Sequence, residues 1–135
     1  VITSALKNAS ISPNDISVIK CHGTATVGGD VAEANGMRRA FESVKEFPLC
    51  SALKPFMGHT LGACGLSEFI LFCGAAQQGF IPATKGIAES GNELAIELNQ
   101  ELKEPPSGCY LLNYFGFGGN NTSLVADLYA GDSHG

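Results

Sequence analysis

The sequence predicts a layered α/β fold in which helices cover a mixed β-sheet. Three short apolar runs have the composition of buried strands, and each leads to a chemically distinctive residue or loop. Ile16–Ile19 precedes His22, Leu49–Leu53 precedes Lys54, and Cys109–Tyr114 precedes a glycine-rich run. Longer segments with helical or continuous apolar spacing separate these runs. Because ligand sites in open α/β sheets lie beyond the carboxyl ends of strands, we expect the three strand ends to face one pocket.

Size and composition indicate one domain that belongs to something larger. The 135 residues are enough for a single core, which we place at residues 1–130, followed by a disordered tail at 131–135. Charged residues make up only 16% of the chain, which is typical of a surface partly buried against another chain. The chain also begins with neither Met nor a strand before its first helix, so we expect it to be part of a longer protein.

Charge and cysteine content exclude several classes. A net charge of -5 without a basic stripe argues against a nucleic-acid partner. The 5 cysteines lack Cys-x-x-Cys spacing and lie mostly in apolar runs, which favours a reducing, cytoplasmic setting over a disulfide framework.

The first half predicts a helix from Val1 to about Asn8 and a strand at Ile16–Cys21. A glycine loop over 27–29 should follow. Asp30 then resembles a helix N-cap with Glu33 in capping-box position, which predicts a helix over 31–41.

The second half opens with a strand at Leu49–Leu53 and a loop over 54–58. The apolar stretch over 60–79 approaches the length of a membrane span. It contains Glu68, however, and a carboxylate at mid-span costs about 2–3 kcal/mol in a bilayer, so we predict a buried helix and no membrane contact. Beyond it we expect an extended segment at 80–83, a loop-rich region at 85–106 with a short edge strand over 94–98, and β-strands at 109–115 and 122–129.

Two histidines are the candidate catalytic groups. His22 precedes Gly23, and His59 follows Gly58 at the start of a helix, so both have open backbone beside them. An imidazole at a helix N-terminus tends to stay neutral and can then donate from Nε2 to a developing oxyanion. The alternative for each is a purely structural histidine. Metal binding is not expected, because Cys21 and His22 are adjacent and His59 with Cys64 lacks a ligand spacing.

Lys54 ends a buried strand, so its ammonium needs a partner. Glu33 is the leading candidate. Alternatively, Glu33 only caps its helix while Lys54 extends to water. The run from Gly116 to Asn121 lacks the Lys-Ser/Thr of a phosphate loop, and we interpret it as a mobile turn carrying Phe117. The alternative is a glycine-rich hairpin with Phe117 in the core.

Together, three motifs resemble those of β-ketoacyl synthases, in order and spacing. His22-Gly23-Thr24-Ala25-Thr26 with Gly29-Asp30 and Glu33 is similar to their His-Gly-Thr-x-Thr…Gly-Asp-x-x-Glu motif, and the run from Lys54 to Gly65 resembles their Lys…Gly-His-x-x-Gly-Ala-x-Gly motif. The run from Asn113 to Asn121 is similar to Asn-Ser-Phe-Gly-Phe-Gly-Gly-Thr-Asn. The resemblance covers the chain to about residue 129.

The resemblance implies the carboxyl-terminal half of a thiolase-like fold and a decarboxylative Claisen condensation of malonyl and acyl thioesters in fatty acid or polyketide-type biosynthesis. The resemblance also implies roles for single residues. His22 and His59 would be catalytic and would bind the thioester carbonyl, and Lys54 would be held by Glu33, with Asp30 in support. Thr24 and Thr26 would contact the phosphopantetheine arm, and Phe117 would gate the acyl pocket, made mobile by Gly116 and Gly118.

The resemblance also implies what lies elsewhere. The nucleophilic cysteine of the family belongs to the amino-terminal half, and no cysteine here has its sequence context. The implied partners are that half, an acyl carrier protein and a second subunit of a homo- or heterodimer. The resemblance implies no cofactor, because the carrier's phosphopantetheine arm serves as the substrate carrier. Tyr114, Asn120 and Met57 depart from the motifs, and the first two concern the gating loop.

Two rival functions follow. The chain could be a non-catalytic partner that resembles a chain-length factor, although His22, Lys54 and His59 would then have no use. It could instead be a thioesterase or acyl carrier that uses Cys21 or Cys64.

Overall fold

The computed structural model describes residues 1–87, 94 and 96–128. These residues form an α/β fold whose one sheet has the strand order β2-β1-β3-β4. Strand β1 pairs in parallel with β2 and β3, and β3 pairs antiparallel with β4. The helices and strands are α1 (Ile2–Ala9), β1 (Ile16–Lys20), α2 (Val27–Ala40), β2 (Leu49–Ser51), α3 (Lys54–Met57), α4 (Cys64–Gln77), β3 (Cys109–Phe115) and β4 (Asn121–Asp127).

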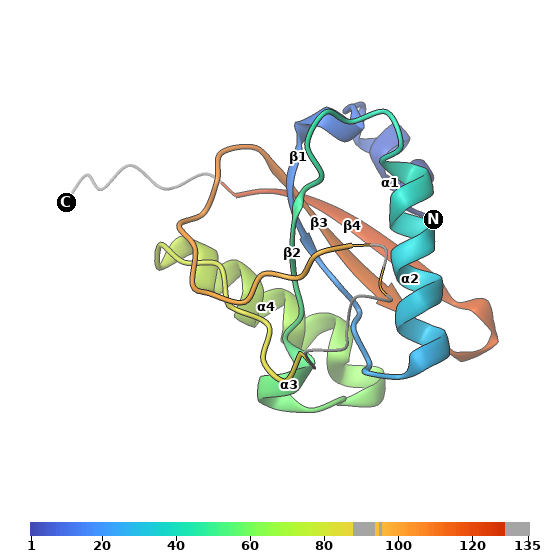
Figure 1. The fold of residues 1–135 in the computed structure, drawn as a ribbon, viewed down its shortest axis with the longest axis vertical. Coiled ribbons are helices and arrows are strands. Elements are labelled where there is room, and N and C mark those ends of the chain that lie inside the picture. The colour runs from blue at the N-terminus through green and yellow to red at the C-terminus, as the bar shows by residue number, and fades with distance from the viewer. Residues whose placement is uncertain (88–93, 95, 129–135) are drawn as a thin grey trace.

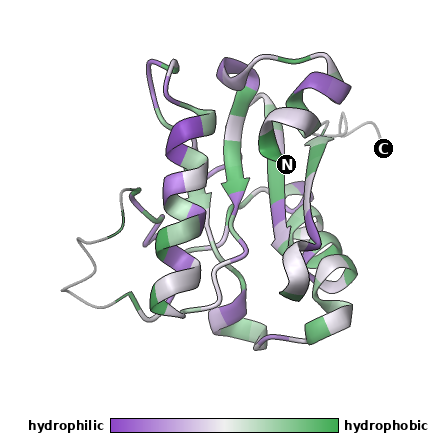
Figure 2. Ribbon diagram, turned by 90° about the vertical axis from the view of Figure 1, so that its right-hand side faces the viewer, coloured by the Kyte–Doolittle hydropathy of each residue, from purple (hydrophilic) through white to green (hydrophobic). Residues whose placement is uncertain are grey.

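The sheet separates two apolar cores. Helices α1 and α2 cover one face, on the right of Figure 1, and α4 covers the other. The first core joins Leu6 and Met37 to Ile19, and the second joins Phe72 to Val18 and Leu112. Because successive strand residues point to opposite faces, Val18 and Ile19 of β1 belong to different cores. Figure 2 shows the central strands as largely hydrophobic, while α2 carries hydrophilic residues along its outer side.

Helix α2 begins earlier than the sequence predicted. Its N-cap is Thr26, and the amide of Asp30 already donates to the Thr26 carbonyl at 2.9 Å. Residues 27–29 are therefore helical, and the predicted N-cap at Asp30 and capping box with Glu33 are wrong. Glycine weakens a helix without forbidding one, and Asp30 still lies in the first turn, where an acidic side chain is favourable.

The strands that lead to the site end slightly before their predicted limits. Strand β1 stops at Lys20, although the Cys21 amide still donates to the Ser51 carbonyl at 2.8 Å. Strand β2 stops at Ser51, and Lys54 opens the short helix α3 where a loop was predicted. The apolar stretch over 60–79 forms a 3-10 turn (Leu61–Ala63) followed by α4. Within the described residues, no helix is long and apolar enough to cross a membrane.

The remaining segments are placed by single contacts. The predicted extended segment at 80–83 makes an isolated bridge between Ile81 and Lys103, and the predicted edge strand over 94–98 contributes one parallel bridge between Leu98 and Cys50. Residue 95 of that strand, the end of the predicted strand 122–129 and the tail at 131–135 lie outside the described residues.

Candidate functional site

One cavity collects the residues that follow the three parallel strands. It has a volume of about 990 Å³ and lies beyond the carboxyl ends of β1 and β3. Both histidines line it, together with four of the residues for which a binding role was predicted, whereas Gly118 and Lys54, which was expected to face the same pocket, are not among its lining residues. These lining residues include His22, Thr24, Thr26, Glu33, His59, Cys64, Tyr114, Phe115, Gly116 and Phe117.

The two imidazoles lie edge to face, with their ring centroids 5.5 Å apart and an angle of 87° between the ring planes. His22 is buried, with 7% of its surface exposed, and its ring also lies 5.7 Å from that of Phe115. His59 is exposed on the loop between α3 and the 3-10 turn. Both rings line the cavity described above.

His22 is held at its backbone as well as at its ring. Its amide and that of Gly23 donate to the two carboxylate oxygens of Glu33, at 2.8 and 2.9 Å. Its carbonyl accepts from Lys54 Nζ at 2.5 Å, and its Nδ1 lies 3.3 Å from the same nitrogen. Gly23 has φ +50°, and a Cβ added there would lie 2.8 Å from Ala52 Cβ, so this turn requires glycine.

Lys54 pairs with Glu68 and not with Glu33, so both sequence interpretations of Lys54 are wrong. The Lys54 ammonium is buried and donates to Glu68 Oε1 at 2.6 Å. Glu68 rises from α4 on the opposite side of the sheet from α2, whereas both oxygens of Glu33 are taken by backbone amides. Backbone donors compete for a carboxylate as well as a lysine does, and sequence spacing cannot rank them.

These contacts fix the tautomers of both rings. A lysine ammonium has no acceptor, so Nδ1 of His22 accepts from Lys54 and the ring proton lies on Nε2. The backbone amide of Leu61 donates to Nδ1 of His59 at 3.1 Å, which likewise leaves the proton of that ring on Nε2. Leu61 reaches this position with φ 51°, a left-handed conformation that leucine rarely adopts. The site therefore offers two Nε2–H donors.

The environment of His22 favours its neutral form. Burial and then the cations of Lys54 and Lys20 lower the pKa of His22 to about 4, from 6.5. The neutral state expected from the sequence thus has a different cause at this residue, since no helix N-terminus is involved. A neutral ring with a fixed Nε2–H can donate to an oxyanion at physiological pH without losing its proton.

Thr24 and Thr26 line the same cavity, whereas Asp30 is not among its lining residues. The hydroxyls of Thr24 and Thr26 lie 3.0 Å apart at the start of α2. Burial raises the pKa of Asp30, and its Oδ1 has no hydrogen-bond partner among the described residues. Ala25 lies between the two threonines at φ 58°, so backbone strain is stored on this side of the site as well.

The glycine-rich run forms an open turn after β3. Phe117 is 94% exposed and begins a 3-10 turn that contains Gly118 at φ 74°. A Cβ at Gly116 would lie 3.0 Å from the Asn120 carbonyl oxygen, so the chain folds back closely there. No described side chain packs Phe117 into the core.

Of the two cysteines named as possible nucleophiles, Cys21 is not among the residues that line the cavity. Cys21 points into the core beside Cys50, and this contact together with burial raises the pKa of its thiol. Cys64 is also buried, although it lines the cavity. Within residues 1–87, 94 and 96–128, no group of three or more His, Cys, Asp or Glu residues could hold a metal ion.

Sequence reasoning missed three members of the site: Lys20, Glu68 and Asn113, each fully buried. Lys20 Nζ donates to Glu68 Oε2 at 2.5 Å and to the Asn113 carbonyl at 2.9 Å. The sequence contained a signal for two of them, Lys20 and Glu68. A lysine that ends an apolar strand and a glutamate inside an apolar helix both require partners, and pairing them with each other satisfies both.

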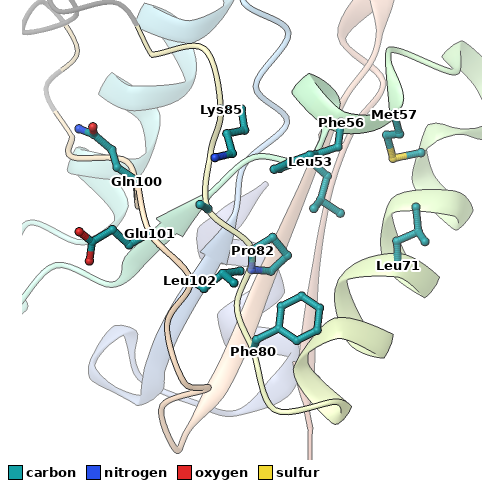
Figure 3. Close-up of a pocket in the computed structure, with 11 residues that line it drawn as sticks. Leu53, Phe56, Met57, Leu71, Phe80, Pro82, Lys85, Gln100, Glu101 and Leu102 are labelled. Atoms are coloured by element: carbon teal, nitrogen blue, oxygen red, sulfur yellow. The ribbon is translucent and has the colours of Figure 1, made fainter.

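A second cavity, of about 500 Å³, lies between α3, α4 and the segments near residues 80–85 and 100–102 (Figure 3). Figure 3 shows Phe80, Pro82 and Leu102 on one side of it and Met57 and Leu71 on the other. Its lining is mainly apolar and includes none of the predicted catalytic residues.

Comparisons with known proteins agree with these observations. Residues 1–88 match the family model for the carboxyl-terminal domain of β-ketoacyl synthases. A curated relative from Vibrio harveyi, 3-oxoacyl-(acyl-carrier-protein) synthase 2, is 35% identical over 124 residues, which cover 90% of this chain and 30% of the relative.

Solved structures agree on the fold. The ishigamide ketosynthase/chain length factor matches with a TM-score of 0.83 and 28% identity, covering 95% of this chain and 32% of that one. A ketosynthase from Xenorhabdus doucetiae, solved in complex with its chain length factor, matches with a TM-score of 0.78 and 35% identity, covering 90% of this chain and 30% of that one.

The predicted α/β, thiolase-like fold is therefore confirmed, and the chain spans about a third of the length of these relatives. The matched family model, the two-histidine site and the order of the three motifs lead to one conclusion: this chain belongs to the family of β-ketoacyl synthase carboxyl-terminal domains.

Proposed function

We propose that the chain supplies the decarboxylating half of a β-ketoacyl synthase, which condenses malonyl-carrier protein with an acyl thioester. The observation that carries this proposal is the pair of Nε2–H donors on rings 5.5 Å apart at one cavity. A malonyl thioester carbonyl that accepted from both rings would be polarised by two preorganised donors. Such donors stabilise an oxyanion by several kcal/mol without reorganisation during the reaction.

The proposed reaction is a decarboxylation followed by a condensation. The bond between the malonyl α-carbon and its carboxylate breaks, CO₂ leaves, and the electron pair becomes an enolate whose oxygen accepts from His22 and His59. The enolate carbon attacks the acyl thioester, and the thiolate of the acyl-bearing cysteine departs. His22 and His59 keep their protons throughout. Lys54 is a positioning residue, because it contacts Nδ1 and the carbonyl of His22 and not the cavity.

We assign the acyl-bearing cysteine to a segment other than this chain, because the raised pKa of Cys21 and its place in the core do not suit a nucleophile. Thr24 and Thr26 are proposed contacts of the phosphopantetheine arm, and Phe117 a gate of the acyl pocket. The exposed position of Phe117 and the left-handed Gly118 support the mobility that a gate needs.

An apolar face on α4 supports a partner. Leu66 and Ile70 are 68% and 59% exposed on this helix, and Leu61 is 67% exposed just before it. A helix that is apolar all round is normally buried on every side. We propose that the amino-terminal half of the synthase covers this face and that the complete enzyme, a dimer, receives an acyl carrier protein.

A second candidate is a non-catalytic, chain-length-factor-like subunit. The Xenorhabdus relative was solved in complex with such a subunit, which favours a heterodimeric setting. Fixed tautomers and a buried ion pair are features that a pure scaffold would not need, so we favour the enzyme.

The test co-expresses this chain with the amino-terminal part of the Vibrio harveyi relative and measures CO₂ release from malonyl-carrier protein. We expect activity in the wild type, a loss of roughly 100-fold or more in His22→Ala and in His59→Ala, and no change in Lys7→Met, an exposed control on α1. A folded complex without decarboxylation would favour the scaffold. Rapid selective labelling of Cys64 by iodoacetamide would instead favour a thiol enzyme.

A further inference from the structure

Lys20 is a cation that the proposed reaction does not use, yet it is among the most buried side chains of the molecule. None of its surface is exposed. Its Nζ donates to Glu68 Oε2 at 2.5 Å and to the carbonyl of Asn113 at 2.9 Å, and lies 3.8 Å from the centroid of the Tyr114 ring. These three contacts use the three donor directions of an ammonium group, so Lys20 is fully satisfied without water.

Lys20 and Lys54 divide Glu68 between them. Lys20 takes Oε2 at 2.5 Å and Lys54 takes Oε1 at 2.6 Å. With both oxygens occupied, the carboxylate cannot rotate without breaking an ion pair, so Oε1 stays directed at Lys54. Lys54 in turn contacts Nδ1 and the carbonyl of His22. The position of the His22 ring therefore depends on a residue that does not touch it.

The hydrogen bonds around Lys20 and His22 form a closed network. The carbonyl of Asn113 accepts from Lys20, while its side-chain amide lies 3.5 Å from Glu33 Oε1, the oxygen that accepts from the His22 amide. The closed network runs through His22, Lys54, Glu68, Lys20, Asn113 and Glu33 and returns to His22.

We propose that Lys20 is a positioning residue. It locks Glu68, so that Lys54 holds the His22 ring in its Nε2–H tautomer. Lys20 also adds a second cation near this ring, which favours its neutral form. Tyr114 takes part by offering its ring face to Lys20. The catalytic meaning of this assignment rests on the proposed function, but the coupling between Lys20 and His22 does not.

The charges around His22 support the second part of the proposal, that Lys20 helps to keep the His22 ring neutral. The ionisable groups around His22 are Lys54 of α3, Lys20 of β1, Glu68 of α4, Glu33 of α2 and His59 of the loop. Of these groups, Lys54 and Lys20 are the cations, and Glu68 and Glu33 are the carboxylates that oppose them. Lys20 is one of the cations that lower the pKa of His22, while burial lowers the pKa of Lys20 itself, with Glu68 opposing that effect.

The test uses the 135-residue chain and needs no substrate. Nitrogen-15 shifts of the His22 ring report both its titration midpoint and its tautomer. In Lys20→Met we expect the midpoint to rise by about 0.5–1 pH unit, as removal of a nearby unit charge predicts, and the neutral ring to become a mixture of tautomers. Lys7→Met removes the same charge from an exposed position and should leave both readouts unchanged. Tyr114→Phe keeps the ring face and should also leave them unchanged.

If Lys20→Met does not fold, the double variant Lys20→Met/Glu68→Gln replaces the test, because it keeps the net charge of the cluster and removes both ion pairs of Glu68, including the one that holds Lys54. There we expect the midpoint to stay low while the tautomers mix. A His22 ring that stays purely Nε2–H in the double variant, or an unchanged titration in folded Lys20→Met, would overturn the proposal. Loss of CO₂ release in the separate assay, with the spectroscopic coupling intact, would count only against the proposed function.

Discussion

The two histidines are held by different means. His22 lies in a buried network that fixes its amide, its carbonyl and its ring, through partners from α2, α3 and α4. His59 is exposed, and the one hydrogen bond that its ring makes to a described residue comes from the amide of Leu61, two positions along the chain. One donor is thus positioned by tertiary structure and the other by a local turn. Substitutions in the first region should cost stability, while those in the open region should leave it nearly intact.

The largest effect is expected at Glu68. Glu68→Gln leaves Lys20 and Lys54 without the carboxylate that compensates both, and breaking a buried pair in this way costs about 3–5 kcal/mol. Urea unfolding measures the loss. The matched control is Glu101→Gln, whose side chain is 80% exposed in a pair of 3.6 Å with Lys103, and it should change stability by less than about 1 kcal/mol. Equal losses in the two variants would mean that the network does not stabilise the fold.

The turn that delivers His22 should be the next most sensitive. Gly23→Ala places a Cβ 2.8 Å from that of Ala52, in a backbone with φ +50°. Strain of this kind costs roughly 1–3 kcal/mol. Gly36→Ala is the control, since its Cβ would meet nothing within 4 Å inside α2, and it should stabilise the chain by about 0.5–1 kcal/mol. In thermal unfolding, the midpoint should fall in Gly23→Ala and rise in Gly36→Ala. A higher midpoint in Gly23→Ala would contradict the geometry of this turn.

A pH dependence should distinguish His22 from the open region. Its pKa is about 4 in the folded chain and 6.5 when unperturbed, so between these values the unfolded chain binds a proton that the native chain does not. The contribution of His22 to stability is therefore complete above pH 6.5 and is lost as the pH falls towards 4. Burial raises the pKa of Glu33, which acts in the opposite direction, so the comparison must be made against His22→Gln.

The measurement is the urea midpoint of both proteins from pH 4.5 to 7. The difference between wild type and His22→Gln should shrink as the pH is lowered. A constant difference would show that His22 titrates normally.

The smallest effect is expected at Phe117. Its side chain is 94% exposed, so Phe117→Ala should change the free energy of unfolding by less than about 0.5 kcal/mol. Phe72→Ala, which empties a fully buried position in the core beneath α4, is the contrasting variant and should cost about 3–5 kcal/mol. Chemical denaturation of both measures the contrast. A large loss at Phe117 would mean that the glycine turn packs against the protein.

Much of the site followed from the residues alone. The apolar runs that lead to His22 and Gly116 predicted strand ends around a shared cavity, because the side of a sheet on which a loop emerges is set by strand direction, whereas Lys54 lies behind His22 and does not line that cavity. Motif order predicted the family. Each of these inferences depends on neighbours in the sequence or on a local period.

Partner choice was decided by the tertiary structure. The selection of Glu68 in place of Glu33 for Lys54 and the burial of Lys20 both depend on groups that meet only after the sheet has brought α2 and α4 to its two faces. A buried charge takes whichever opposite charge and donors surround it at a few ångströms, and the sequence carries no record of those distances.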